Sequence, residues 1–164
     1  SVDEAQGVEV KEQTDVSIDI NIDAYLPESY IKNHNQRIDI YKKIAAVEND
    51  DDKFEIEDEL IDRFGDIPEP VQNIIAVAAL KAPAKEAGIC DISQHSDVLQ
   101  ITFMPEYIDA NLIMGLDGQF PRRIKLMSSE KPAINYTLGK DGKNILDIVN
   151  NLLSVIKELQ NGEK

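Results

Sequence analysis

Apolar and polar side chains alternate strictly over residues 16–24, and this period of two constrains the fold most strongly. Successive side chains of a β-strand point to opposite faces of the sheet, so strict alternation predicts a strand with one buried face. Pro27 follows shortly afterwards and ends the strand. The apolar members of the segment are Val16, Ile18, Ile20, Ile22 and Ala24.

Helical periodicity replaces this alternation after Pro27. We expect a first helix over about 28–47, because its apolar residues recur at spacings of seven, three and four. A second helix is expected over 51–64, with Asp51 and Asp52 as N-caps and Gly65 as a left-handed C-terminal cap. The apolar positions of the first helix are Ile31, Ile38, Tyr41 and Ala45.

A third helix is expected to begin near Pro70 and to end at about residue 87, before Gly88, with a kink at Pro83. The second half of the chain then changes character. It contains short strand-like segments, turn-forming residues and a closing amphipathic helix. We expect strands over 89–93, 97–103, 122–127 and 132–138, helices over 106–115 and from 145 onward, and turns at 115–121 and 139–143.

These elements come in uneven groups rather than in regular βαβ alternation, which predicts an α+β fold. We expect a single domain over residues 15–164, with a mixed or antiparallel sheet packed against about five helices. Residues 1–14 are polar and have no sustained period, which is typical of a linker or an N-terminal arm.

The formal charge of −14 argues against a nucleic-acid-binding role, because an acidic domain repels phosphate backbones. A basic protein surface is the more compatible partner. No apolar run reaches the roughly 20 residues of a membrane span. A single cysteine and no signal peptide favour the reducing cytoplasm, and the absence of an initial methionine leads us to expect a piece of a longer protein.

Catalytic residues are hard to assign. His34, His95 and Cys90 are the available candidates for a nucleophile, a base or a metal ligand, but none has the spacing of a known motif. Cys90 follows the pattern of a small core residue. Phosphate-binding loops and nucleophile elbows are also missing from the sequence. An enzyme would need a pocket that brings these three residues together with other polar groups.

Acidic residues concentrate on the expected second helix. Residues 48–66 contain ten acidic side chains and two basic ones, a local charge of −8. At about 100° per residue, one side of the helix is apolar and the opposite side is charged. The apolar side comprises Phe54, Ile56, Leu60, Ile61 and Phe64, and the charged side comprises Glu55, Asp58, Glu59, Asp62 and Arg63.

Two interpretations of this charged face stay open from the residues alone. In the first, it is a solvated surface on which Glu59 and Arg63 form an i, i+4 pair of about 0.3–0.5 kcal/mol. In the second, it is a docking surface for a basic partner, and Arg63 supplies a forked donor that fixes the orientation.

The segment from Arg37 to Ile89 resembles the C-terminal domain of the bacterial transcription-repair coupling factors, the Mfd family. The pattern is an Arg, a Tyr followed by two basic residues, an acidic stretch, E-L-x-D-R-F-G-x-x-P, and a hydrophobic helix that ends at Gly-Ile. The matching residues are Arg37, Tyr41, Lys42, Lys43, Glu59, Leu60, Asp62, Arg63, Phe64, Gly65, Pro68, Gly88 and Ile89.

The resemblance implies a non-catalytic regulatory domain that follows a DNA-translocase motor. In that family the domain docks in cis on the UvrB-like N-terminal module, masks the UvrA-binding surface and restrains the motor until stalled RNA polymerase is engaged. Carried over residue by residue, the docking contacts are Glu59, Asp62 and Arg63. The resemblance implies no cofactor for this domain, since ATP and Mg²⁺ belong to the motor domains.

An acidic adaptor or DNA mimic that binds basic protein surfaces is the alternative. Such a protein needs a broad negative surface and depends little on Arg63. We therefore expect Arg63→Glu to weaken a specific dock and to leave a charge-only binder unaffected or stronger.

Overall fold

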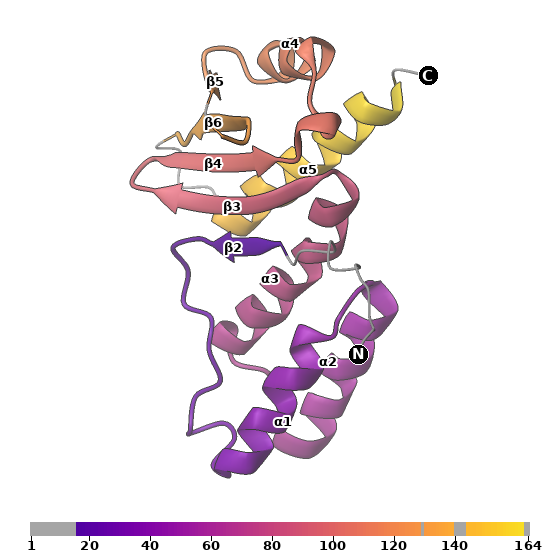
Figure 1. The fold of residues 1–164 in the computed structure, drawn as a ribbon. Helices are drawn as coiled ribbons and strands as arrows, with labels where there is room; N and C mark the ends of the chain where they lie inside the picture. Colours follow the sequence, from indigo (N-terminus) through magenta and orange to yellow (C-terminus); the bar gives the residue numbers. More distant parts are fainter. Residues whose placement is uncertain (1–15, 129, 140–143, 163–164) are drawn as a thin grey trace.

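The computed structural model describes residues 16–128, 130–139 and 144–162. The arm expected over 1–14, and residues 140–143 of the expected turn, lie outside this part. The elements are β2 (Ser17–Asp19), α1 (His34–Ala45), α2 (Asp50–Phe64), α3 (Glu69–Glu86), β3 (Ile89–His95), β4 (Val98–Phe103), the 3₁₀ turn η2 (Pro105–Tyr107), α4 (Ala110–Gln119), β5 (Ile124–Met127), β6 (Ala133–Thr137) and α5 (Ile145–Gly162) (Figure 1).

The described strands form one mixed sheet in the order β2-β3-β4-β6-β5. β2 runs parallel to β3, with Ile18 opposite Ile92, and the other neighbouring strands are antiparallel. The tight β3–β4 connection places Ser96 at a φ of 59°. The expected α+β class, with a mixed sheet and five α-helices among the described residues, is confirmed.

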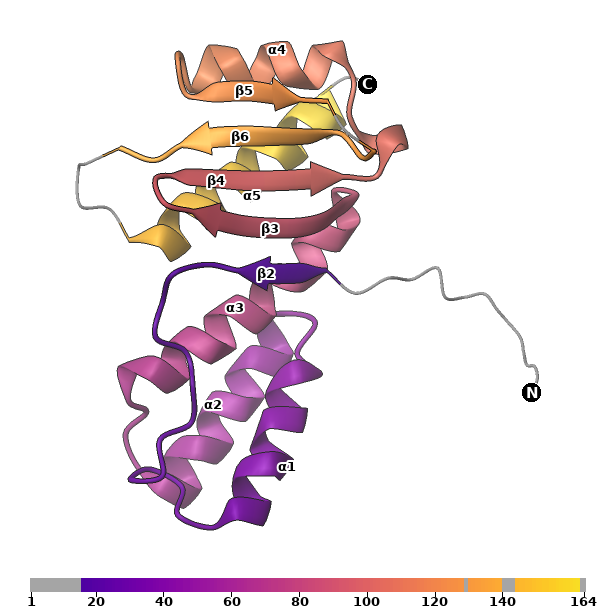
Figure 2. The ribbon, with the colours of Figure 1, turned by 60° about the vertical axis from the view of Figure 1, so that its left-hand side comes forward.

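The sheet forms one hydrophobic core with α5, α4 and the C-terminal half of α3. Figure 2 shows α5 crossing behind the strands and α4 lying beyond β5 at one end of the sheet. As the closing helix was expected to do, α5 buries a stripe that includes Val149, Leu152 and Ile156. The largest side chains of this core include Phe103, Ile92, Leu99, Ile134 and Leu116.

A second hydrophobic cluster lies among α1, α2 and the first half of α3 (Figure 1). α3 takes part in both clusters, because Val71 and Ile75 belong to the helical one and Leu80 and Ala84 belong to the sheet core. The three helices therefore stand below the sheet as one unit built on α3. The fully buried side chains of this unit include Ile31, Ile40, Leu60, Val71 and Ile75.

The strand expected over 16–24 is much shorter than its alternation predicted, since only Ser17–Asp19 pairs with a neighbour. Alternate side chains nevertheless turn inward as far as Leu26. Beyond β2 the segment runs down the helical unit (Figure 2), where Asn73 Nδ2 donates to the carbonyl of Asp23 and the Tyr25 amide donates to the carbonyl of Pro70. In the segment beyond β2, the period of two in the sequence therefore indicates side chains buried against helices rather than strand pairing.

The first helix begins six residues later than expected and buries a different face. Asn33 caps it by accepting a hydrogen bond from the Gln36 amide. Its buried residues are Ile40 and Ile44, whereas Ile38 and Tyr41 are 40% and 42% exposed. Ile31 of the expected apolar row is buried but precedes the helix, and Ala45 is exposed. The row was wrong for Ile38, Tyr41 and Ala45 because α1 has one buried side, and that side faces α2 and α3.

Helix α4 corrects a second expectation, because residues 115–119 continue the helix instead of forming a turn. Asp109 starts the helix by accepting from the Leu112 amide, so it begins at Ala110 rather than 106. Gly115 suits the helix interior because a Cβ there would lie 2.7 Å from Leu159 Cδ2 on α5. The glycine therefore permits close packing of α4 on α5.

Helix α3 spans the expected residues and continues through Pro83 to Glu86. Gly88 follows with a φ of +77°, and a Cβ there would overlap the Tyr107 ring. Glycine is therefore required where α3 turns into β3.

Candidate functional site

The acidic helix α2 begins and ends with specific backbone hydrogen bonds. Asn49, not Asp51 or Asp52, is the N-cap and accepts from the Asp52 amide. The Asp52 carboxylate in turn accepts from the Glu48 amide, in the manner of a capping box. Gly65 has the expected positive φ of 92°, but its ψ of −164° differs from that of a left-handed helical cap. This conformation is essentially restricted to glycine.

Helix α2 is rotated relative to the face predicted from its sequence. Leu60 is fully buried as expected, Ile56 is buried and Phe64 is partly buried. Phe54 and Ile61, however, are 56% and 50% exposed. Both lie roughly 100–120° from Leu60 around the helix axis. The buried arc is narrower than predicted because α2 packs mainly against α1, α3 and Tyr30, and these cover the side that carries Ile56, Leu60 and Phe64.

Glu59 is the centre of an ionic cluster that joins two helices. Its Oε2 accepts from Lys43 Nζ on α1 at 2.8 Å and from Arg63 Nη1 at 2.6 Å. Asp39 Oδ2 lies 3.7 Å from the same lysine. The expected i, i+4 pair therefore forms, but Lys43 had not been predicted to join it. No local pattern marks a contact between residues sixteen positions apart.

The cluster shifts the pKa values of its members in opposite directions. Hydrogen bonds from Lys43 and then Arg63 hold the pKa of Glu59 below its usual 4.5. The hydrogen bond to Glu59 raises the pKa of Lys43 above 10.5. Glu59 is therefore ionised at neutral pH, and its charge is neutralised within the domain.

Arg63 is held from a second side by aromatic rings. Its guanidinium carbon lies 4.9 Å from the centre of the Phe64 ring, and Phe64 packs against Tyr30 at 5.8 Å between ring centroids. The Tyr30 hydroxyl donates to the Gly65 carbonyl at 2.9 Å. The Arg63 side chain remains 38% exposed. The structure thus orients the guanidinium while leaving part of it accessible.

Asp62 differs from its two neighbours on the predicted face. It is exposed, and it forms no ion pair within the described part of the chain. The predicted site residues therefore have distinct geometries. Glu59 is engaged by its own domain, Arg63 is oriented by Glu59 and Phe64, and Asp62 presents an uncompensated carboxylate to solvent.

Two residues of the motif that resembles the family, Arg37 and Tyr41, form hydrogen bonds with the backbone that precedes α1. Arg37 Nη1 donates to the carbonyls of Ile31 and Lys32, and the Tyr41 hydroxyl accepts from the Leu26 amide. These contacts fix the segment that descends from β2 to α1. Arg37 and Tyr41 therefore position the helical unit rather than extend the charged face of α2.

The structure does not bring the three catalytic candidates together. Cys90 and His95 lie at opposite ends of β3, five residues or roughly 17 Å apart along the strand. His34 starts α1 in the helical unit. Cys90 is only partly buried, and its Sγ donates to the Thr102 carbonyl at 3.5 Å.

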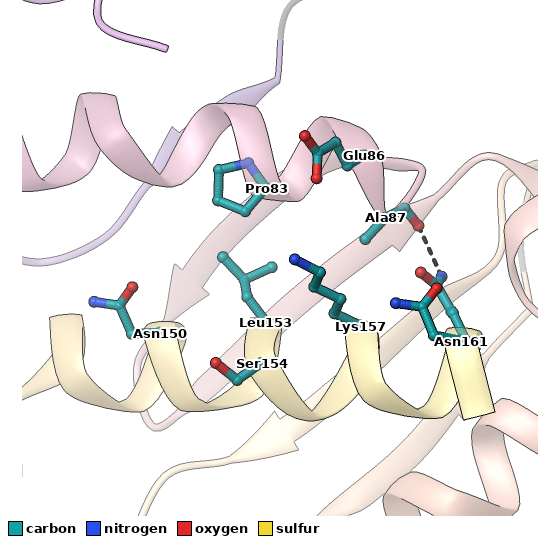
Figure 3. Close-up of a pocket in the computed structure, with 9 residues that line it drawn as sticks. Pro83, Glu86, Ala87, Asn150, Leu153, Ser154, Lys157 and Asn161 are labelled. Atoms are coloured by element: carbon teal, nitrogen blue, oxygen red, sulfur yellow. Dashed lines mark hydrogen bonds between the residues drawn. The ribbon is translucent and has the colours of Figure 1, made fainter. Parts of the chain in front are cut away.

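A groove of about 430 Å³ lies between the end of α3 and α5 (Figure 3). Leu153 and Ala87 lie in it, and Lys157 and Glu86 bring one charge of each sign. Gln160 Nε2 donates to the carbonyls of Ala87 and Tyr107. Pro83 and the side chains of Asn150, Ser154 and Asn161 line the remainder, so the groove lacks a paired nucleophile and base.

Among residues 16–128, 130–139 and 144–162, no three His, Cys, Asp or Glu side chains form a group suited to a metal ion. Across the same residues, no helix combines the length and apolar character of a bilayer span.

Comparison with known proteins identifies the family. Residues 20–111 match the TRCF domain family. The chain belongs to the TRCF domain family. This TRCF domain is 34% identical to the transcription-repair-coupling factor of Bacillus subtilis over 98% of the chain, and 36% identical to that of Staphylococcus haemolyticus over 62% of the chain. It spans 14% of the length of the B. subtilis protein and matches 9% of the S. haemolyticus protein.

A solved structure supports the fold. The TRCF domain matches the crystal structure of a C-terminal domain of transcription-repair coupling factor with a TM-score of 0.76. The match covers 95% of this chain and 100% of the other, at 21% sequence identity. The family and relative matches confirm the resemblance inferred from the sequence motifs, and this solved structure supports the fold.

Proposed function

We propose that this TRCF domain is a non-catalytic autoinhibitory module of a transcription-repair coupling factor. It docks in cis on the UvrB-like N-terminal module of the parent protein through Asp62 and Arg63. Docking masks the UvrA-binding surface and restrains the DNA-translocase motor until stalled RNA polymerase is engaged. ATP and Mg²⁺ serve the motor domains, and the setting is the bacterial cytoplasm.

One observation carries the proposal. On the exposed side of α2, the free carboxylate of Asp62 lies beside the oriented guanidinium of Arg63. Asp62 forms no ion pair with any residue that the structure describes, whereas Arg63 is fixed by Glu59 and Phe64. A pre-oriented arginine loses less conformational freedom on binding than a free one. Because it also offers forked donors, it can select one orientation of a partner. Glu59 supports this role as a positioning residue.

Because the two modules are tethered in one chain, a weak contact is sufficient to keep the closed form dominant. Modules joined in one chain have an effective concentration of up to about millimolar, so a Kd of about 10 μM keeps the closed form near 100:1. Binding between separated modules is then only about micromolar, and added salt weakens the ionic contacts.

The test combines the Asp62→Lys and Arg63→Glu variants with an Asp117→Lys control. Asp117 is exposed on α4, so the control makes the same charge change away from α2. Titration calorimetry measures binding of this chain to the N-terminal module, and UvrA binding is measured in the full-length protein. Asp62→Lys is expected to cost about 2–3 kcal/mol and to shift the closed form from 100:1 to near parity.

UvrA binding is therefore expected to increase in the docking variants while the thermal midpoint of the domain stays unchanged. The control should match the wild type in both assays. If both docking variants fold normally and change neither binding in trans nor UvrA access, the charged face is only solvated and the proposal fails.

The acidic-adaptor alternative is favoured by the charge of −14 alone. It predicts that Arg63→Glu maintains or strengthens binding to basic proteins, because the variant is more acidic. A specific dock predicts the opposite result.

A further inference from the structure

Two large apolar side chains lie exposed on the acidic helix α2. Phe54 is 56% and Ile61 is 50% exposed, and both lie outside the helical hydrophobic cluster. They are seven residues apart, so they lie within about 20° of each other around the helix axis. Together they form an apolar strip, which we define as Phe54 and Ile61, along one line of α2.

The strip is continuous with the proposed docking face. Asp58 lies four residues from Phe54 and three from Ile61, which makes it a surface neighbour of both. Asp58 is likewise four residues from Asp62, so one acidic side chain connects the strip to the docking residues. The strip and Asp62 are therefore adjacent parts of a single exposed ridge.

Shallow grooves on either side confirm the direction of this ridge. Glu59 and Lys43 line the groove between α2 and α1. Ile61 lines the opposite groove, toward α3, together with Ile67 and Ala76. The exposed ridge between the grooves thus runs from Glu59, past Asp62 and Asp58, to the apolar strip.

We propose that the apolar strip seats in an apolar patch surrounded by basic residues on the UvrB-like module. This inference rests on the proposed function and adds an apolar component to its ionic contacts. The occupant follows from charge, since the strip lies within a segment of charge −8. A second copy of this chain would present the same acidic ridge and be repelled. A basic rim around an apolar centre complements both features.

The two components differ in their dependence on salt. Ionic contacts between exposed groups weaken as ionic strength rises, whereas burial of apolar surface does not depend on charge screening. The dock should therefore retain a salt-resistant part in the wild type. That part should be lost when the strip is removed.

The experiment measures UvrA binding by the full-length parent protein at 50 mM and 500 mM salt. Phe54→Ala and Ile61→Ala remove the strip singly and together, and Met114→Ala removes an apolar side chain that is 70% exposed on α4. Each strip variant is expected to open the closed form roughly tenfold, and the double variant roughly a hundredfold. In the strip variants, the fraction of open form should be greater at 500 mM than at 50 mM salt. Met114→Ala should match the wild type in UvrA binding at both salt concentrations.

Thermal melts accompany each variant, and Ile61→Gln keeps a long side chain while removing the apolar group if Ile61→Ala proves unstable. The inference is overturned, and the proposed function stays intact, if the folded strip variants leave UvrA binding unchanged at both salt concentrations while Asp62→Lys still increases it. If Asp62→Lys also leaves UvrA binding unchanged, the proposed function is overturned as well. Sedimentation of this chain as a dimer that Phe54→Ala dissociates would show that the occupant is a second copy, and would also overturn the inference.

Discussion

Lys43 on α1 donates a 2.8 Å hydrogen bond to the Glu59 carboxylate on α2, the same carboxylate that holds Arg63. The lysine therefore acts on the proposed docking face through Glu59. We expect Lys43→Met to loosen Arg63 and to weaken binding to the N-terminal module by about three- to tenfold. Lys42→Met is the matched control, because it removes the adjacent exposed lysine. Equal effects of the two variants in calorimetry would exclude a positioning role for Lys43.

The ionic cluster should contribute to stability over a defined pH range. The pKa of Glu59 is lowered in the fold, so its contribution is complete above the unfolded value of 4.5 and is lost as pH falls through the folded pKa. The pKa of Lys43 is raised, so its contribution is complete below the unfolded value of 10.5 and is lost as pH rises through the folded pKa.

Urea denaturation of the wild type and Glu59→Gln from pH 2.5 to pH 9 tests this prediction. The difference in unfolding free energy should be constant from about pH 5 upward and should shrink in acid. A difference that persists unchanged at pH 2.5 would show that the Glu59 charge does not contribute through these hydrogen bonds.

Leu60 and Phe64 should differ in their contributions to stability. Leu60 is fully buried, and we expect Leu60→Ala to cost about 2–5 kcal/mol. Phe64 is only partly buried, so Phe64→Ala should cost less than the roughly 3–5 kcal/mol of a fully buried phenylalanine. Urea denaturation measures both, and a larger loss for Phe64→Ala would contradict the observed rotation of α2.

Two glycines should respond to alanine in opposite ways. Gly88 has a φ of +77°, and its added Cβ would overlap the Tyr107 ring, so Gly88→Ala should cost at least about 2 kcal/mol. Gly118 lies in α4 with open space around its Cβ position, so Gly118→Ala should stabilise the domain by about 0.5–1 kcal/mol. Thermal melts compare the two, and stabilisation by Gly88→Ala would contradict the Tyr107 contact.

Sequence reasoning predicted the fold class and most elements because strand alternation, helical periodicity and the Gly and Pro boundaries are local signals. It failed where tertiary packing overrides them. Gly115 resembled a turn residue because its role depends on Leu159, which is 44 positions away. Ile38 and Tyr41 fitted a core row because spacing does not reveal which side of α1 meets α2.

The candidate site was predictable in part. The motif and the helical wheel placed Glu59 and Arg63 side by side, and the structure pairs them. The exposure of Phe54 and Ile61 was missed because hydrophobicity alone predicts burial. Lys43 was missed as a partner because its contact with Glu59 depends on how α1 packs against α2. A single segment of sequence shows neither which side of α2 is covered nor which residue of α1 it meets.

Helix α3 runs without interruption from the helical cluster beneath α2 to the core under the sheet, with Val71 in one and Ala84 in the other. One continuous helix therefore connects the two cores, and the path between them along α3 crosses no loop. For the proposed dock, force applied at α2 would reach the five strands through packed helices rather than through a linker.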